Sequence, residues 1–326
     1  MKINIKIIVF FILTLLSSPV PVRAQNIEEG IKVTAVQLEV SPSLYSSEDH
    51  FYNSMDRLMG KIVEKHKPDL VIFPEYTGVF LALVPYHNLI DGFPDISKAL
   101  SRIQKIYPQI GSINELFSLQ ADVTGRIMDR IWGRLANKYG ITIVAGSYFA
   151  LTYEALDDTE KPHVELRNRA VVYGLTGERI YSQDKVFLTE FEQNVLALSS
   201  GEIGSAAGFN VKGRRVVISI CRDTFMEEWE ERFEGADLWI DIKANGTEYT
   251  EEERRRFLTA LPERIANSEV PYGVTVCLTG RYLDLFWEGE SSFIEKEDES
   301  YRVLKATESY RSLEIVAQLL TFDDIY

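Results

Sequence analysis

The chain has 326 residues, of which 45% are apolar and 26% are charged, and its formal net charge is −14. This composition is typical of a globular protein and excludes a disordered chain or a small disulfide-stabilised scaffold. The excess of acidic side chains would repel a phosphate backbone, so we expect no nucleic-acid partner. The length alone permits one large domain or two.

The first residues differ in character from the rest of the sequence. Two lysines precede a run at residues 7–16 that is apolar except for Thr14 and is too short to span a bilayer comfortably. Val22-Arg23-Ala24 then places aliphatic or small residues at the two positions that a signal peptidase reads. We therefore predict that residues 1–24 are a secretory signal peptide, cleaved near Ala24. The mature protein would be secreted or periplasmic and would keep no stable membrane span; an uncleaved anchor is the alternative.

Export would place the two cysteines, Cys221 and Cys277, in an oxidising compartment. A disulfide bond between them is one alternative, although a single bridge is no framework for a chain of this length. The four histidines are scattered, and no Cys/His spacing typical of a zinc site occurs. We therefore predict neither a metal site nor a cofactor.

Predicted strands and helices alternate along the sequence, which indicates an α/β fold. In the first half, strands are predicted at residues 32–40, 70–73 and 141–145, and helices at 47–66 and 124–139. In the second half, strands are predicted at 169–173, 179–183, 216–220, 238–242 and 272–278, and helices at 226–233 and 251–268. No linker or repeat divides the chain, so one domain over residues 25–326 is expected. Residues 86–123 are less regular and are interpreted as an insertion with short helices of its own.

Three polar residues lie at or just beyond the ends of predicted strands. Glu75 comes after the strand at 70–73, Lys185 after the strand at 179–183, and Cys221 after the strand at 216–220. Sites in parallel α/β sheets form at the carboxyl ends of strands. Taken singly, each residue has a simpler explanation, as a cap, a surface charge or a small buried side chain. Their joint pattern favours a functional site.

An ordered set of short motifs resembles the nitrilase superfamily of carbon–nitrogen hydrolases and extends over nearly all of the mature chain. The motifs are the opening strand with Gln37, Phe73-Pro74-Glu75-Tyr76, Ala145-Gly146-Ser147, Asn168–Gly177, Asp184-Lys185, Cys221-Arg222-Asp223, Gly235-Ala236-Asp237 and Gly289-Glu290-Ser291. Each motif alone is weak, but their order along the chain is specific. The resemblance implies an α/β fold of the single-domain α-β-β-α sandwich type, often assembled into dimers.

The resemblance also implies a catalytic Glu–Lys–Cys triad, which maps onto Glu75, Lys185 and Cys221. A second glutamate is expected a few residues after the lysine. Glu190 and Glu192 compete for that place, and the spacing from Lys185 favours Glu192. Val186 stands where the family often has a histidine, and the interval from Glu75 to Gly146 is long, so the substrate class and the assembly are left open.

The chemistry of such a triad follows from the residues themselves. A free thiol with a pKa of about 8.5 is mostly protonated at neutral pH and needs a base. Glu75 would take the proton of Cys221, which attacks the substrate carbon, and would return it to the leaving nitrogen. Lys185 and the backbone N–H of Arg222 would stabilise the oxyanion. Water would then hydrolyse the thioester.

The expected function is therefore that of an exported thiol hydrolase. Its small-molecule substrate would contain a non-peptide carbon–nitrogen bond, as an amide, a carbamoyl compound or a nitrile. Two alternatives belong to other classes of function. A soluble N-acyltransferase of the same superfamily would pass the thioester to an amine, and a non-catalytic binding module would keep the fold without the reaction.

Two further expectations concern assembly and access. Phe225, Trp229 and Phe233 are spaced at i, i+4 and i+8 after Cys221, and this apolar stripe faces either the core or a second subunit. Because the family pairs subunits in this region, we expect a homodimer. The insertion at 86–123 starts shortly after Glu75 and carries enough apolar residues to pack down, so we expect it to act as a lid that restricts access to the site.

Overall fold

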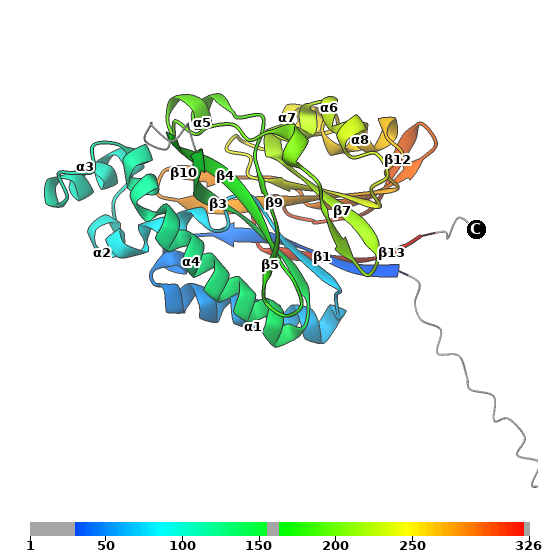
Figure 1. The fold of residues 1–326 in the computed structure, drawn as a ribbon, viewed down its shortest axis with the longest axis horizontal. Helices are drawn as coiled ribbons and strands as arrows, with labels where there is room; N and C mark the ends of the chain where they lie inside the picture. Colours follow the sequence, from blue (N-terminus) through cyan, green and yellow to red (C-terminus); the bar gives the residue numbers. More distant parts are fainter. Residues whose placement is uncertain (1–29, 155–162, 323–326) are drawn as a thin grey trace, which may run out of the picture.

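A computed structural model describes residues 30–154 and 163–322 (Figure 1). The strands are β1 (Gly30–Val40), β2 (Leu70–Phe73), β3 (Thr142–Glu154), β4 (His163–Tyr173), β5 (Arg179–Asp184), β6 (Phe209–Val211), β7 (Arg214–Ile220), β8 (Leu238–Lys243), β9 (Tyr272–Tyr282), β10 (Leu285–Trp287), β11 (Ser292–Glu297), β12 (Ser300–Ala306) and β13 (Glu314–Thr321). The α-helices are α1 (Glu48–His66), α2 (His87–Ile90), α3 (Ile96–Ile106), α4 (Ile113–Tyr139), α5 (Glu190–Asn194), α6 (Glu228–Arg232), α7 (Glu251–Phe257) and α8 (Leu261–Asn267). Four 3-10 helices are η1 (Pro42–Tyr45), η2 (Val79–Tyr86), η3 (Ile203–Ser205) and η4 (Cys221–Phe225).

The strands follow the order β5-β4-β3-β2-β1-β9-β8-β7-β6. Strand β1 pairs in parallel with both β2 and β9, and so joins the two halves. Each half continues with a parallel pair, β2 with β3 on one side and β9 with β8 on the other. The carboxyl ends of β2, β7 and β8, which carry site residues, therefore belong to parallel pairings.

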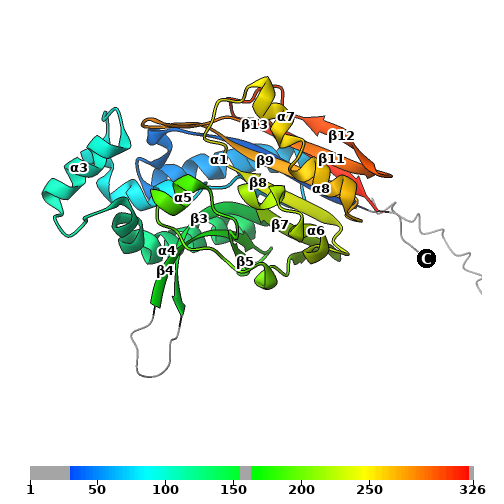
Figure 2. The same ribbon diagram turned by 90° about the horizontal axis from the view of Figure 1, so that it is seen from above.

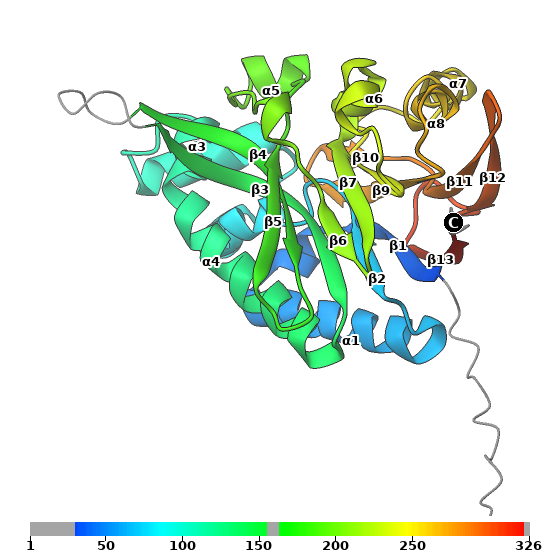
Figure 3. The same cartoon turned by 45° about the vertical axis from the view of Figure 1, so that its right-hand side comes forward.

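The two halves of the sheet pack face to face, with helices on the outer surfaces (Figure 3). Strand β2 shows why, because its side chains alternate between the two faces. Leu70 and Ile72 join the apolar cluster between the two sheet halves, whereas Val71 and Phe73 join the cluster under α1 and α4. On the other side, Val217 packs with residues of α6 and α8. These layers form an α-β-β-α sandwich, so the predicted fold class is confirmed.

Most predicted elements are present, but several boundaries differ. The helix predicted at 251–268 is two helices, α7 and α8, because Pro262 lies in the first turn of α8 and lacks the N–H that a continuous helix would need. The helix predicted at 226–233 is reduced to α6, preceded by the 3-10 turn η4. The strands β6 and β10 to β13 were not expected from the pattern.

The predicted insertion at 86–123 contains α2 and α3, which lie together at one end of the sandwich (Figure 2). Its last part is different from the expectation, since residues 113–123 are the first turns of α4. This long helix begins at Ser112, whose side chain accepts a hydrogen bond from the Glu115 N–H, and ends at Gly140 in the left-handed conformation.

The predicted signal peptide at residues 1–24 lies outside the described residues. Within residues 30–154 and 163–322, no helix has both the length and the apolar character needed to cross a membrane.

The apolar stripe after Cys221 is divided between two environments. Trp229 and Phe233 are fully buried in the chain's own core, where Phe233 also contacts the Trp239 ring. Phe225 is half-buried beside the cavity described below. Trp229 and Phe233 therefore face the chain's own core, which is the first of the two alternatives, and leave no exposed stripe for a second subunit. The homodimer itself stays a prediction.

We predict that Trp229→Ala lowers the free energy of unfolding by about 3–5 kcal/mol, because it leaves a cavity in the core. Urea unfolding measures the effect, and Leu258→Ala, at an exposed position, is the control that should change stability by less than about 0.5 kcal/mol. Unchanged stability of Trp229→Ala together with a smaller particle in light scattering would instead place Trp229 at an interface.

Candidate active site

The three residues predicted at strand ends meet at one cavity. Glu75 lies in the loop after β2, Lys185 directly follows β5, and Cys221 begins η4 directly after β7. All three line a cavity of about 400 Å³. The strands that carry them are far apart in the sheet order, so only the face-to-face packing of the two sheet halves brings their ends together.

A buried lysine connects two glutamates at the base of this cavity. The Lys185 ammonium lies 2.9 Å from Glu75 Oε1 and 2.8 Å from Glu192 Oε2. The Asn168 amide donates to both glutamates as well, at 2.9 Å to Glu75 Oε1 and 3.1 Å to Glu192 Oε1. All four side chains are almost completely buried. Such buried charges are tolerated because each has a partner of opposite charge and further hydrogen bonds.

Local structure distinguishes the two candidate second glutamates. Thr189 and Glu192 form a capping box at the start of α5, in which each side chain accepts from the backbone N–H of the other. This box turns the Glu192 carboxylate inward, where Tyr76 also donates its hydroxyl hydrogen to Glu192 Oε1 at 2.7 Å. Glu190 is exposed at the surface. The structure thus brings Glu192, and not Glu190, to Glu75 and Lys185.

The two glutamates differ in their pKa. Burial raises the pKa of Glu75, and the attraction of Lys185 opposes this rise only in part. Burial acts on Glu192 in the same direction, but Lys185 and the donors from Thr189 and Tyr76 outweigh it and lower the pKa of Glu192. Glu192 is therefore the firmly ionised partner of Lys185, whereas Glu75 is the carboxylate better suited to accept a proton.

Cys221 occupies a sharp turn between β7 and η4. Its φ of 54° is in the left-handed region, which costs energy for a residue other than glycine and often marks a functional position. Burial, and after it the nearby Glu75 carboxylate, raises the pKa of the Cys221 thiol to about 12. The resting thiol is thus protonated and requires a base for attack. Cys277, on β9, is a second free thiol and is fully buried, so the two cysteines form no disulfide bond.

Several motif residues hold the loops of the site in place. The Asp223 carboxylate accepts from the backbone N–H groups of Phe187, at 2.7 Å, and Ile220, at 3.2 Å, and so ties the loop after β5 to the nucleophile turn. The Ser147 hydroxyl accepts from the Tyr76 N–H at 2.9 Å. Gly146 must be glycine here, because its φ is 69° and a Cβ would lie 2.0 Å from the carbonyl oxygen of Pro74.

A second buried ion pair was not found from the sequence. Lys243, at the end of β8, lies 3.0 Å from Asp241 Oδ2 and donates to the carbonyl oxygen of Cys221 at 3.3 Å. Its ammonium also faces the rings of Phe225 and Phe257. Both charged residues are almost fully buried. Charges at i and i+2 in an otherwise apolar strand are the signal that could have indicated such a pair.

We predict that Lys243→Met lowers the free energy of unfolding by about 3–5 kcal/mol, because Asp241 would keep a buried charge without its partner. Urea unfolding measures the change. The double variant Asp241→Leu/Lys243→Met, which removes both charges, should recover most of the loss. Equal stability of Lys243→Met and the unmodified protein would show that the pair contributes nothing.

Among residues 30–154 and 163–322, no group of three or more His, Cys, Asp or Glu side chains could hold a metal ion. Glu75, Lys185, Cys221 and Arg222 line the cavity, and Glu192 contacts the Lys185 ammonium without lining the cavity itself. The catalytic roles of Glu75, Lys185, Cys221 and Glu192 stay a prediction.

No model of a known protein family matches the sequence, and neither does any curated protein. Solved structures do match the fold. An amidase from Nesterenkonia sp. aligns over 90% of this chain and 91% of its own with a TM-score of 0.60 and 16% identity. A cysteine-to-serine variant of the Nesterenkonia AN1 amidase, described as a member of the nitrilase superfamily, aligns over 88% and 91% with a TM-score of 0.58 and 17% identity.

The chain has the nitrilase-superfamily fold. A further structure of the Nesterenkonia sp. AN1 amidase, with a glutamate and a cysteine both replaced and acrylamide bound, aligns over 89% of this chain and 91% of its own, with a TM-score of 0.59 and 16% identity. The sandwich inferred from the motifs and the fold of these structures therefore agree. At this level of identity the likeness concerns the fold, and any function has to be argued from the residues of this chain.

Proposed function

We propose that the protein is a carbon–nitrogen hydrolase that cleaves small amides through a thioester on Cys221. The observation that carries this proposal is the meeting of Glu75, Lys185 and Cys221 at one cavity, with Glu192 as the ionised partner of the lysine. The amidase of similar fold supports the amide class, because its cysteine-to-alanine variant binds butyramide.

The first half-reaction forms the thioester. Glu75 takes the proton of the Cys221 thiol while the sulfur attacks the carbonyl carbon, whose π electrons move to the oxygen. An ammonium group has three N–H donors, and Lys185 uses its contacts to Glu75 and Glu192 for two of them. The third, with the backbone N–H of Arg222, stabilises the oxyanion. Glu75 then gives its proton to the leaving nitrogen as the C–N bond breaks.

The second half-reaction returns the enzyme to its starting state. Glu75 takes a proton from water while the water oxygen attacks the thioester carbon. The C–S bond breaks, the sulfur recovers a proton from Glu75, and the carboxylic acid leaves. The raised pKa of Glu75 suits both transfers, because the carboxyl group must alternate between base and acid.

The proposal includes export, which rests on the composition of residues 1–24, and assembly as a homodimer. Cleavage near Ala24 is tested by sequencing the amino terminus of the protein recovered from its native host, and a mature chain that begins at Met1 would contradict it.

We predict that Cys221→Ala abolishes ammonia release from primary amides, carbamoyl compounds and nitriles, whereas Cys277→Ala keeps substantial activity. Each substitution removes one thiol, so they are matched, and Cys277 is fully buried on β9 and does not line the cavity. Ammonia release by the unmodified protein over the substrate panel gives the reference and decides among amide, carbamoyl and nitrile carbon. Hydrolysis that survives in Cys221→Ala, or none in the unmodified protein, would contradict the proposal.

We predict that Glu75→Gln lowers the rate of amide hydrolysis by about 10²–10⁴-fold, because the general base is lost. At pH 8, iodoacetamide should alkylate Cys221 faster in Glu75→Gln than in the unmodified protein, because removal of a nearby negative charge lowers the pKa of the thiol. In the amidase of similar fold, a glutamate-to-glutamine variant still forms covalent adducts at its active-site cysteine. Parallel loss of hydrolysis and of alkylation would show that Glu75 positions Cys221 and does not act as its base.

A further inference from the structure

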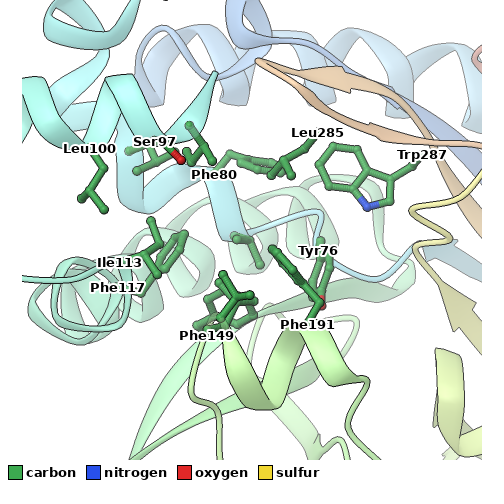
Figure 4. A pocket seen from close by; sticks show the side chains of 15 residues that line it. Tyr76, Phe80, Ser97, Leu100, Ile113, Phe117, Phe149, Phe191, Leu285 and Trp287 are labelled. Carbon is green, nitrogen blue, oxygen red and sulfur yellow. The ribbon is translucent and has the colours of Figure 1, made fainter. Parts of the chain in front are cut away.

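A second cavity of about 160 Å³ adjoins the catalytic cavity. Tyr76, Phe191, Leu285 and Trp287 line both cavities, so the second cavity begins where these side chains bound the first. Figure 4 shows that its side chains converge from opposite sides on one space. We call this cavity the side chamber.

The side chamber is built in large part by the segment predicted as a lid. Ile96, Ser97 and Leu100 of α3 form part of its wall, and Ile113 and Phe117 of α4 form another part. The segment therefore does more than cover an opening. It adds a compartment beside the reacting groups, and the shape of that compartment depends on where α3 packs.

The lining of the side chamber is almost entirely apolar. Its only polar side-chain groups are the Ser97 hydroxyl, the Trp287 indole N–H and the Tyr76 hydroxyl, and the last already donates to Glu192. Aromatic rings form much of the remaining wall, with Phe149 in edge-to-face contact with both Tyr76 and Phe117. A charged or hydrogen-bonding group placed here would lose its water without gaining partners, which is unfavourable.

The volume limits the size of the group that fits. An engineered apolar cavity of about 150 Å³ stays dry and binds benzene, so the side chamber matches one phenyl ring or a chain of about six carbon atoms. An empty apolar space of this kind gains from being filled, since the incoming group leaves water and makes contacts that the walls otherwise lack.

We propose that the side chamber binds the acyl group of the substrate, and that the preferred substrates are primary amides with about six apolar carbons, or a phenyl ring, beyond the carbonyl carbon. This inference rests on the proposed amide hydrolysis. The nitrogen of a primary amide carries only hydrogen atoms, so the acyl side is the only part long enough to reach Leu100 and Phe117. Leu100 and Phe117 are then specificity-determining residues.

Binding to the Cys221→Ala protein tests the side chamber apart from turnover. Calorimetry with acetamide, butyramide, hexanamide, octanamide and decanamide should show affinity rising by up to about fourfold per methylene as far as octanamide, and no further rise at decanamide. 5-Hydroxypentanamide, which has the length of hexanamide but ends in a hydroxyl group, should bind at least about tenfold more weakly. Equal affinity along the series, or for hexanamide and its hydroxyl counterpart, would overturn the proposal.

Two matched substitutions in the Cys221→Ala background locate the effect. Leu100→Trp fills the side chamber and should reduce the hexanamide-to-acetamide affinity ratio at least about tenfold. Leu119→Trp makes the same change at an exposed position of α4 outside the chamber and should leave the ratio unchanged. An unchanged ratio in Leu100→Trp would overturn the assignment. The chain-length series needs neither variant, so it decides the question even where Leu100→Trp fails to fold.

Failure of the proposed function has a different signature. If hexanamide binds the Cys221→Ala protein with the expected preference but the unmodified protein releases no ammonia from it, the proposed acyl binding in the side chamber is supported and the proposed amide hydrolysis is contradicted. If ammonia is released from all chain lengths at equal kcat/KM and binding shows no preference, hydrolysis stands and the chamber assignment falls.

Discussion

The burial of one lysine between two carboxylates is the constraint on which the rest of the site depends. Lys185, Glu75 and Glu192 are all removed from solvent, and such charges are stable only with near-complete partnering. Their partners come from separate parts of the chain. Asn168 lies opposite Lys185 across the β4–β5 pairing, and the backbone N–H of Ala244, after β8, donates to Glu75 Oε2 at 2.9 Å. The network thereby fixes the loops after β2, β5 and β8 relative to one another.

Unequal partnering gives the two carboxylates different chemistry. Glu192 accepts from Thr189, Tyr76, Asn168 and Lys185, so its charge is held and its pKa is lowered. Glu75 has fewer donors, is completely buried, and has a raised pKa. Lys185 thus contacts an ionised carboxylate, Glu192, and a second carboxylate, Glu75, that is able to accept and release a proton. Burial, and after it the Glu75 carboxylate, raises the pKa of the nearby Cys221 thiol, so the thiol is protonated at rest.

The sequence was informative where a polar residue ends an apolar strand. Periodicity and composition predict where strands end, and Glu75, Lys185 and Cys221 were identified from these ends. The spacing after Lys185 favoured Glu192. Contacts between residues far apart in the sequence could not be predicted in this way. Lys243, for example, reaches Cys221 only because β7 and β8 pair in parallel. The stripe with Trp229 shows a second limit: its period reveals an apolar face but not what covers it. The strand β12 could not be predicted from the sequence because most of its residues are exposed and its half-buried positions do not alternate.

Tyr76 unites the two cavities into one structure. Tyr76 follows Glu75 directly, has a φ of 63°, and donates its backbone N–H to the Ser147 hydroxyl, so its position is fixed together with that of Glu75. Its hydroxyl group completes the donors to Glu192, while its ring forms the wall between the catalytic cavity and the side chamber. An acyl group in the chamber would therefore press on the same side chain that helps to ionise Glu192. In this arrangement the fit of the substrate's apolar end and the electrostatics of the reacting end depend on one residue.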